Sequence, residues 1–341
     1  MIRLTLIAAT AFCLLGFSAQ AQDTLDIYWI DADGGAATLI VTPERESVLM
    51  DAGYSLPDDG HAKRVVAAME DAGVESLDYF IASHFHGDHV GGVEALASLV
   101  TIGEFVAHGE STEQTTERGR PAWEAYLAGA ALAERRAPTP VRPGDILPLA
   151  GIEFTIVSSN LEVPFRSFDP QGPNALCTNA DPGPEDMGEN ARSVGYMVTL
   201  GDFEFLNLGD LTEGGQHELA CPENLIGVVD LMQVPHHGSD LAPQLLSALM
   251  PTATVSSTGA RKGGSPEGFE VVASIPDIEG IWALHRAMDA DDDHNASESM
   301  VANPTENDDQ GYWIKAEVQQ DGSGFTIING RNQYSETYTT K

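Results

Sequence analysis

Three histidines and an aspartate within six positions constrain this chain more than any other feature of its sequence. The motif reads His84-x-His86-x-Asp88-His89, and it follows directly after a buried strand predicted at residues 79–82. With only 10 His in 341 residues, chance is a poor explanation for this grouping. Neutral imidazoles bind divalent zinc well, and carboxylates complete such sites. Because Asp88 and His89 are adjacent, they can serve two neighbouring metals from a loop, whereas on a strand they would point apart.

Hydrophobic periodicity predicts strands and helices in alternation over the rest of the chain. Further strands are expected at residues 25–30, 37–41, 47–50, 102–107, 154–157, 194–200, 203–207, 231–234, 253–256, 281–284, 312–318 and 325–328. Helices are expected at 61–72, 93–99, 123–136, 243–249 and 266–273, and long polar loops at 160–190 and 286–310. Strands that first meander and then alternate with helices predict an α/β domain in which sheets pack between helices.

The charge balance excludes several kinds of partner. Lys and Arg number 17 against 52 Asp and Glu, which gives a formal net charge of −35. A polyanion or an anionic membrane surface is repelled by such a protein unless a local basic pocket intervenes. We therefore expect no stable nucleic-acid partner and no membrane association. The hydrophobic content of 42% is that of a folded globular protein.

Residues 1–21 have the pattern of a secretory signal peptide. Arg3 supplies the positive start, residues 4–17 form an apolar run, and Ala19-Gln20-Ala21 is a small-x-small cleavage site. The alternative, a membrane anchor, requires about 20 apolar residues. We expect a single mature domain, 22–341, that is exported and is periplasmic or secreted. Its Cys177 and Cys221 could form a disulfide, stay as free thiols, or place Cys221 near a metal.

Taken in order along the chain, the motifs resemble those of the metallo-β-lactamase superfamily. The resemblance lies in the His-x-His-x-Asp-His motif after a buried strand and in three further stretches, Leu49-Met50-Asp51-Ala52-Gly53, Phe205-Leu206-Asn207-Leu208-Gly209-Asp210 and Val234-Pro235-His236-His237-Gly238-Ser239. It implies an αββα four-layer sandwich and a metallo-hydrolase with two Zn²⁺ ions, or Mn²⁺ in their place.

The same resemblance implies a ligand for each metal. It assigns His84 and His86 to the first ion, Asp88, His89 and a late histidine to the second, and Asp210 to both. Of the late pair, we choose His236 as the ligand because it follows the strand directly, and we expect His237 to support a ligand or to face the substrate. Asp51 is expected to hold the metal-binding loop in place without binding the metal itself. The first ion lacks a third histidine, since His108 comes too early and Asn190 or Ser193 stands in the expected region, so water would complete that site.

Within the superfamily, the chain is similar to the hydrolase domain of ComEC-type competence proteins. The similarity rests on His-His-Gly-Ser and on Asn190-x-Arg192-Ser193. The stretch Ile30-Asp31-Ala32-Asp33-Gly34-Gly35-Ala36 resembles the opening Asp-Val-Gly-Gln-Gly-Asp of those proteins but departs from it at Gly35 and Ala36. Membrane channel segments are absent from the sequence. We therefore expect a free-standing, exported relative without a DNA-uptake role.

Hydrolysis is the expected reaction, with Asp88 orienting the water and passing its proton to the leaving group. Arg261 and Lys262, in a Gly-rich loop before a predicted helix, and Arg192 are candidate contacts for an anionic substrate, although the loop could equally be a solvated turn. The first hypothesis is a hydrolase of small or short phosphoesters. The second is a lactone, β-lactam or thioester hydrolase, and the third is a non-catalytic binding protein with a degenerate site.

Overall fold

The computed structural model describes residues 24–341 except 165, 169–171, 179, 184 and 307–309. The expected signal peptide, residues 1–21, lies outside the described residues. None of the helices in the described part is long and apolar enough to span a bilayer.

The described strands form two mixed sheets. The first has nine strands in the order β17-β16-β15-β1-β2-β3-β4-β5-β6, and the second has eight in the order β14-β13-β12-β11-β10-β9-β8-β7. The first sheet comprises β1 (Leu25–Trp29), β2 (Thr38–Val41), β3 (Ser47–Met50), β4 (Ser76–Ile81), β5 (Thr101–Ala107), β6 (Arg135–Pro140), β15 (Ile314–Val318), β16 (Gly324–Asn329) and β17 (Ser335–Thr339). The second comprises β7 (Ile146–Leu147), β8 (Glu153–Ser158), β9 (Gly195–Leu200), β10 (Phe203–Asn207), β11 (Leu231–Gln233), β12 (Ala253–Ser256), β13 (Gly280–His285) and β14 (Val301–Asn303).

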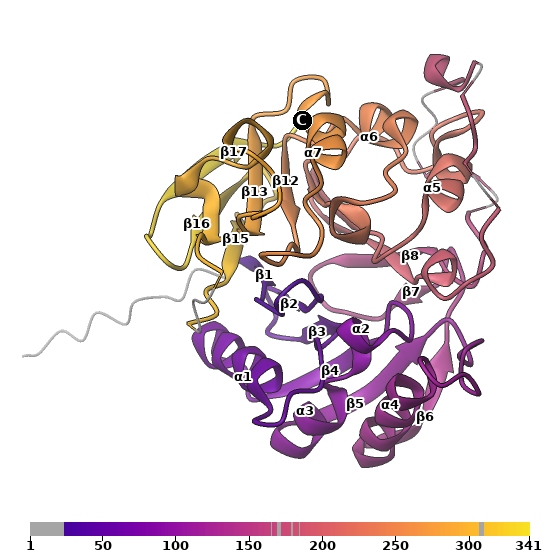
Figure 1. Ribbon diagram of the computed structural model, residues 1–341, viewed down its shortest axis with the longest axis vertical. Coiled ribbons are helices and arrows are strands. Elements are labelled where there is room, and N and C mark those ends of the chain that lie inside the picture. Colours follow the sequence, from indigo (N-terminus) through magenta and orange to yellow (C-terminus); the bar gives the residue numbers. More distant parts are fainter. Residues whose placement is uncertain (1–23, 165, 169–171, 179, 184, 307–309) are drawn as a thin grey trace, which may run out of the picture.

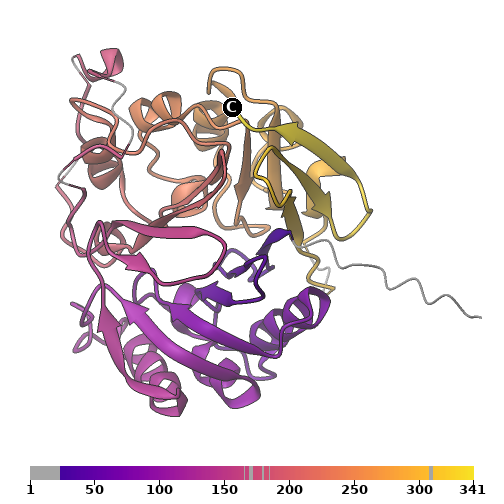
Figure 2. The ribbon, with the colours of Figure 1, turned by 180° about the vertical axis from the view of Figure 1, so that it is seen from behind.

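Helices cover the outer face of each sheet, so the described chain has four layers. In Figure 1, α1 (Gly60–Ala72), α3 (Val93–Leu99) and α4 (Arg120–Leu132) lie below the strands, and α5 (Glu213–Ala220), α6 (Pro243–Leu249) and α7 (Pro266–Ala273) lie above them. The view from behind in Figure 2 shows the strands between the same two groups of helices. Shorter helices are α2 (Gly87–Val90), η1 (Ala175–Cys177), η2 (Asn190–Arg192), η3 (Pro235–Gly238), η4 (Asp292–His294) and η5 (Glu298–Met300).

Successive side chains along a strand point to opposite faces of its sheet. In β1, Ile27 and Trp29 face the second sheet, and Trp29 meets Phe205 edge-on with ring centroids 5.6 Å apart. The intervening Tyr28 joins the cluster under α1, α3 and α4. Both faces of β1 are buried, because one side packs on the other sheet and the other side packs on helices. The observed α/β four-layer architecture confirms the expected fold class.

Most of the expected elements are present, with the differences at the edges. The helix expected at 123–136 ends at Leu132, and the chain continues into β6, an edge strand with Pro138 and Pro140. An edge strand tolerates proline and needs no apolar face, so β6 carries no periodic signal. Elements α2, α5, β7, β14 and β17 were not predicted, and β14 interrupts the loop expected at 286–310.

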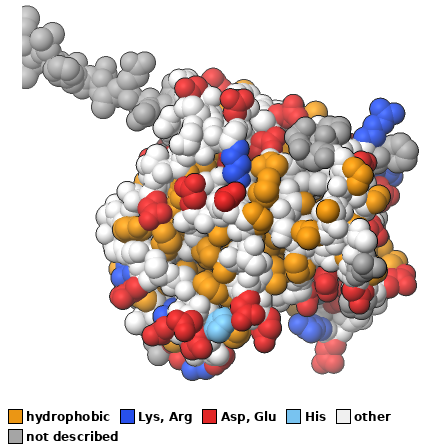
Figure 3. Space-filling view, turned by 90° about the horizontal axis from the view of Figure 1, so that it is seen from above, with side chains coloured by type: hydrophobic (Ala, Val, Ile, Leu, Met, Phe, Trp, Pro, Cys, Tyr) orange, Lys and Arg blue, Asp and Glu red, His pale blue; other side chains and the backbone are white. Residues whose placement is uncertain are grey.

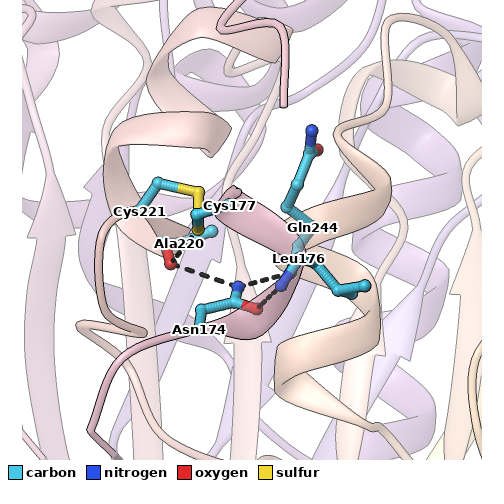
Figure 4. The surroundings of a disulfide bond; sticks show 6 residues. All are labelled: Asn174, Leu176, Cys177, Ala220, Cys221 and Gln244. Carbon is cyan, nitrogen blue, oxygen red and sulfur yellow. Dashed lines mark hydrogen bonds between the residues drawn. A yellow bond between two sulfur atoms is a disulfide. The ribbon is translucent and has the colours of Figure 1, made fainter. Parts of the chain in front are cut away.

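A disulfide joins Cys177 to Cys221, with the two Cα atoms 5.6 Å apart. Figure 4 shows how it ties η1, in the long loop before β9, to the C-terminal end of α5. Beside it, the Asn174 side-chain amide donates hydrogen bonds to the carbonyl oxygens of Ala220 and Gln244. Of the three alternatives that the sequence left open for these cysteines, the structure contains the disulfide.

Carboxylates dominate the charged side chains on the face drawn in Figure 3. Several of the few cations are held by them, as in the ion pairs Arg135–Glu104 and Arg286–Asp292.

Candidate metal centre

The metal motif begins where β4 ends. The chain leaves the buried strand at Ile81, carries His84 and His86 on a short loop, and places Asp88 and His89 in the first turn of α2. This loop is fixed from the second sheet, because the backbone N–H of Val194 donates to the carbonyl of Ser83 at 2.8 Å.

Two neighbouring parallel strands of the second sheet deliver the remaining groups. Asp210 follows the C-terminal end of β10, and His236 and His237 follow that of β11. The loops are joined by a hydrogen bond from the His236 N–H to the Gly209 carbonyl, 3.0 Å long. Parallel strands place their carboxyl ends at one edge of a sheet, so these side chains meet at the same edge.

Four ligand atoms converge there, from Asp88, His89, Asp210 and His237, all within 4.8 Å of one another. The Oδ2 atom of Asp210 lies 3.1 Å from His89 Nε2 and 3.3 Å from His237 Nε2. The Oδ2 atom of Asp88 lies 3.5 Å and 3.6 Å from the same two nitrogens.

The hydrogen bonds of the Nδ1 atoms of His89 and His237 determine whether their Nε2 atoms carry a hydrogen or a lone pair. His89 Nδ1 donates to Asp51 Oδ2 at 2.7 Å, and His237 Nδ1 donates to the Ser257 carbonyl at 2.8 Å. With the hydrogen on Nδ1, each neutral ring turns an Nε2 lone pair toward carboxylates. His237 Nε2 is buried and makes no hydrogen bond to any described residue. A lone pair that faces a carboxylate is stabilised by a proton or a metal ion between the two atoms, so the residues present fit a divalent metal ion.

The electrostatics of the cluster agree with this reading. Burial opposes charge on His89, but the carboxylates of Asp210, Asp88 and Asp51 outweigh it and raise its pKa well above the ordinary value. Burial likewise opposes ionisation of Asp210, yet His237 and His89 hold the pKa of that carboxyl well below its usual range. The group therefore attracts positive charge, as a proton or as a metal ion.

A second pair of ligands lies beside this group. His84 Nε2 and His86 Nδ1 are 3.0 Å apart, and His84 Nδ1 faces Ser83 Oγ at 3.0 Å. Asp210 Oδ2 lies 4.0 Å from His84 Nε2, so its carboxylate stands between the two groups. This placement suits a carboxylate that serves two neighbouring ions.

The structure reverses the expected placement of the late histidines. His237, not His236, lies in the four-residue group; His236 is partly exposed, and its Nε2 lies 3.0 Å from Asn190 Nδ2 and 3.8 Å from Asp210 Oδ2. Both residues have left-handed backbone, with φ of 48° and 54°. The expectation assumed that the first residue after the strand points to the metal. Two successive left-handed residues instead turn the chain so that the second side chain is buried in the site.

Asp51 and Ser193 lie behind the ligands. Buried Asp51 accepts hydrogen bonds from the Ser83 N–H at 2.9 Å, from Ser83 Oγ at 2.7 Å and from His89 Nδ1. Ser193 Oγ accepts from the Asp210 N–H at 3.2 Å. His108 points away from the centre and bonds the buried Glu189 at 3.1 Å.

The departure at Gly35 and Ala36 from the motif of the competence proteins has a structural role. The Ala36 N–H donates to the Asp88 carbonyl at 3.1 Å, and a Cβ on Gly35 would lie 2.3 Å from that same oxygen. Only glycine allows this close approach, so the loop supports the backbone of a ligand residue. Nearby Asp31 is also clustered with acceptors, but Arg64 Nη1 pairs with it at 3.0 Å and supplies the positive charge there.

A cavity of about 370 Å³ adjoins the two groups of ligands, and His86, Asp88 and Asp210 form part of its wall. Lys262 lines it and contacts Asp88 Oδ2, while its Nζ lies 3.3 Å from the Tyr54 hydroxyl. Of the other expected substrate contacts, Arg261 pairs with Asp289 and Glu306 on the surface.

The third expected contact, Arg192, also lies away from the cavity wall, where it bonds Asn160 and the Met187 carbonyl. Tyr54 and Arg118 line the cavity but were not singled out from the sequence. Neither belongs to a spaced motif, so no signal in the chain alone would have found them.

The chain is similar to one protein family over part of its length and to several solved structures. Residues 30–164 match the family model of the metallo-beta-lactamase superfamily. No curated protein matches the chain. Among solved structures, the metallo-beta-lactamase fold protein YhfI from Bacillus subtilis is similar at 11% identity over 76% of this chain and 96% of that chain, with a TM-score of 0.46. A metallo-beta-lactamase from Cronobacter sakazakii is similar at 18% identity over 55% of this chain and 60% of that chain, with a TM-score of 0.32.

The described fold and the His/Asp group together indicate a metallo-hydrolase, and residues 30–164 are similar to the metallo-beta-lactamase superfamily. The matched segment carries the ligands of the motif from His84 to His89, and geometry adds Asp210 and His237, which lie beyond it.

Proposed function

We propose that this protein is an exported two-metal hydrolase of small or short phosphoesters. The observation that carries the proposal is Lys262, which lines the cavity and whose ammonium group contacts Asp88. A cation in contact with the metal-ligand group suits a substrate whose reacting group is itself negatively charged. A lactone or β-lactam has a neutral reacting carbonyl and gains less from it.

The residues that would hold the ions divide into two sets. Asp88, His89, Asp210 and His237 form one set, and His84 and His86 with the shared Asp210 form the other. Two divalent ions, when bound, would supply an activated water and offset the charge that develops on the substrate. Zn²⁺ suits the imidazole-rich donor set, and Mn²⁺ is the alternative.

Asp88 and Lys262 are the chain's own groups at the reacting centre. Burial opposes ionisation of Asp88, but His89, His237 and Lys262 outweigh it and lower its pKa below the ordinary value. A carboxylate held ionised in this way accepts a hydrogen bond from the attacking water and directs it. Lys262 stays protonated, because Asp88 raises its pKa despite its burial. Its charge offsets that of the phosphoryl oxygens.

The proposed compartment and relatives follow from other features. The signal-like segment 1–21 together with the Cys177–Cys221 disulfide supports export, since disulfides persist in oxidising compartments. The His-His-Gly-Ser motif supports a relationship to ComEC-type hydrolase domains. The net charge of −35 supports a small anionic substrate rather than a stable nucleic-acid or membrane partner.

A substrate panel on metal-loaded protein tests the proposal. The panel contains bis-p-nitrophenyl phosphate, nitrocefin and an acyl-homoserine lactone, and elemental analysis accompanies every sample. We expect turnover of the phosphodiester above that of the other two by at least tenfold in kcat/KM. Turnover of nitrocefin or the lactone with no phosphodiester activity would replace the proposal by carboxyl-type hydrolysis.

A further inference from the structure

Arg118 lines the same cavity as Lys262 but reaches it from another part of the fold. Lys262 lies between β12 and α7, whereas Arg118 lies in the segment between β5 and α4. The cavity is thus lined by two cations that are far apart in the sequence, and His86, Asp88 and Asp210 line it as well.

The two cations differ in what they already contact. Lys262 is engaged with Asp88 and lies over the Tyr54 ring, with Nζ 5.5 Å from the ring centroid. Arg118 is exposed, and its side chain forms no ion pair or hydrogen bond with any residue that the structure describes. A guanidinium left unpaired in a chain with 52 carboxylates keeps all its donors available at the cavity.

A neighbouring arginine shows the contrast. Arg120, two positions along, is also exposed, but it pairs with Glu124 at 3.9 Å within α4 and does not line the cavity. Of these two exposed arginines, Arg118 is therefore the one that lines the cavity and is unpaired among the described residues.

The size of the cavity limits the ligand. About 370 Å³ is at the lower end of small-molecule sites, which span roughly 300–1,000 Å³. Such a cavity takes a compact molecule and no duplex. Guanidinium binds phosphate and carboxylate through paired, parallel hydrogen bonds.

We propose that Arg118 is a specificity-determining residue that binds a second anionic group of the substrate, remote from the bond that is hydrolysed. This inference rests on the proposed function, since it takes the reacting group to be the phosphoester held near Lys262. The substrate class is then a compact phosphoester that carries a further phosphate, phosphonate or carboxylate.

Binding of matched probes tests the inference without relying on turnover. Propane-1,3-diphosphonate carries two anionic groups, and propylphosphonate carries one on the same carbon chain. Their Kd values are measured by calorimetry at fixed ionic strength for wild type, Arg118→Ala, Arg118→Lys and Arg120→Ala, with metal content checked by elemental analysis. Arg120→Ala removes the same charge close by and is the control.

We expect Arg118→Ala to weaken the diphosphonate by tenfold or more and the monophosphonate by less than twofold. Arg120→Ala should change both by less than twofold, and Arg118→Lys should recover part of the loss. Equal weakening of both probes by Arg118→Ala, or no weakening of either, would overturn the inference. Wild-type protein that binds the probes as expected but hydrolyses no phosphodiester would overturn the proposed reaction and leave the Arg118 site standing.

Discussion

Asp51 offers the sharpest test of the metal centre, because it touches a ligand without being one. We consider Asp51→Asn. The residue has φ of 64°, and asparagine tolerates this left-handed backbone about as well as aspartate, so the chain path should be kept. The new Oδ1 can still accept from the Ser83 N–H, now 2.9 Å away.

The other oxygen becomes an amide nitrogen, and this is the damaging change. Oδ2 now accepts from Ser83 Oγ and from His89 Nδ1, both at 2.7 Å. An amide there presents a donor to the His89 N–H, so one charge-assisted hydrogen bond, worth about 1.5–3 kcal/mol, is lost. The His89 ring is then free to turn, and its Nε2 no longer points at the metal. We expect metal affinity to fall by roughly 10- to 100-fold, the usual effect of removing such a partner.

Zinc affinity is measured by competition with a chromophoric chelator, and folding by circular dichroism. Asp78→Asn is the matched control, because Asp78 Oδ2 accepts from the Ser47 N–H at 2.7 Å and lies 3.4 Å from Ser47 Oγ, away from the centre. Asp51→Asn should lose affinity while Asp78→Asn keeps it. Equal affinities in the two variants would refute the idea that Asp51 fixes the His89 ring.

Three further predictions concern other contacts. His237→Ala should lose more bound metal than His236→Ala by elemental analysis, because only His237 lies in the four-residue group; the opposite order would contradict that assignment. Although burial opposes ionisation of Glu189, bonds from His108 and Thr112 lower its pKa from 4.5 to about 2, so its contribution is present above the unfolded pKa and is lost as the pH falls from about 5 toward 2. Urea unfolding across that range should show a flatter pH dependence for Glu189→Gln, and an unchanged slope would count against this role. Replacing both Cys177 and Cys221 by Ser should lower the free energy of unfolding by up to about 4 kcal/mol, because the disulfide closes a loop of 44 residues; equal urea midpoints would show that the loop adds nothing.

The fold could be predicted from the sequence wherever one face of an element is buried. The helix at Gly60–Ala72 has its apolar side chains on one side and matches its predicted range of 61–72 almost to the residue. Strand β6 shows the limit, since an edge strand whose residues are all at least partly exposed leaves no apolar pattern to read.

Some residues of the site could likewise be predicted from the sequence, and others could not. Spacing alone brought His84, His86, Asp88 and His89 together, because six positions of chain cannot carry them far apart. The choice between His236 and His237 depended on two backbone angles that no sequence pattern reports. Arg118 depended on a cavity formed by loops far apart in the chain.

The ligands belong to both sheets, since the motif follows β4 of the first and Asp210 and His237 follow strands of the second. An ion bound by this set would therefore link the two sheets at this end of the sandwich. Without it, the buried carboxylates repel one another, and the two sheets should part at this end first. The hydrogen bond from the Val194 amide to the Ser83 carbonyl, 2.8 Å long, connects the two sheets, so exchange of this amide measures their separation. Chelation should speed its hydrogen exchange while leaving the amides between β15 and β16 unchanged.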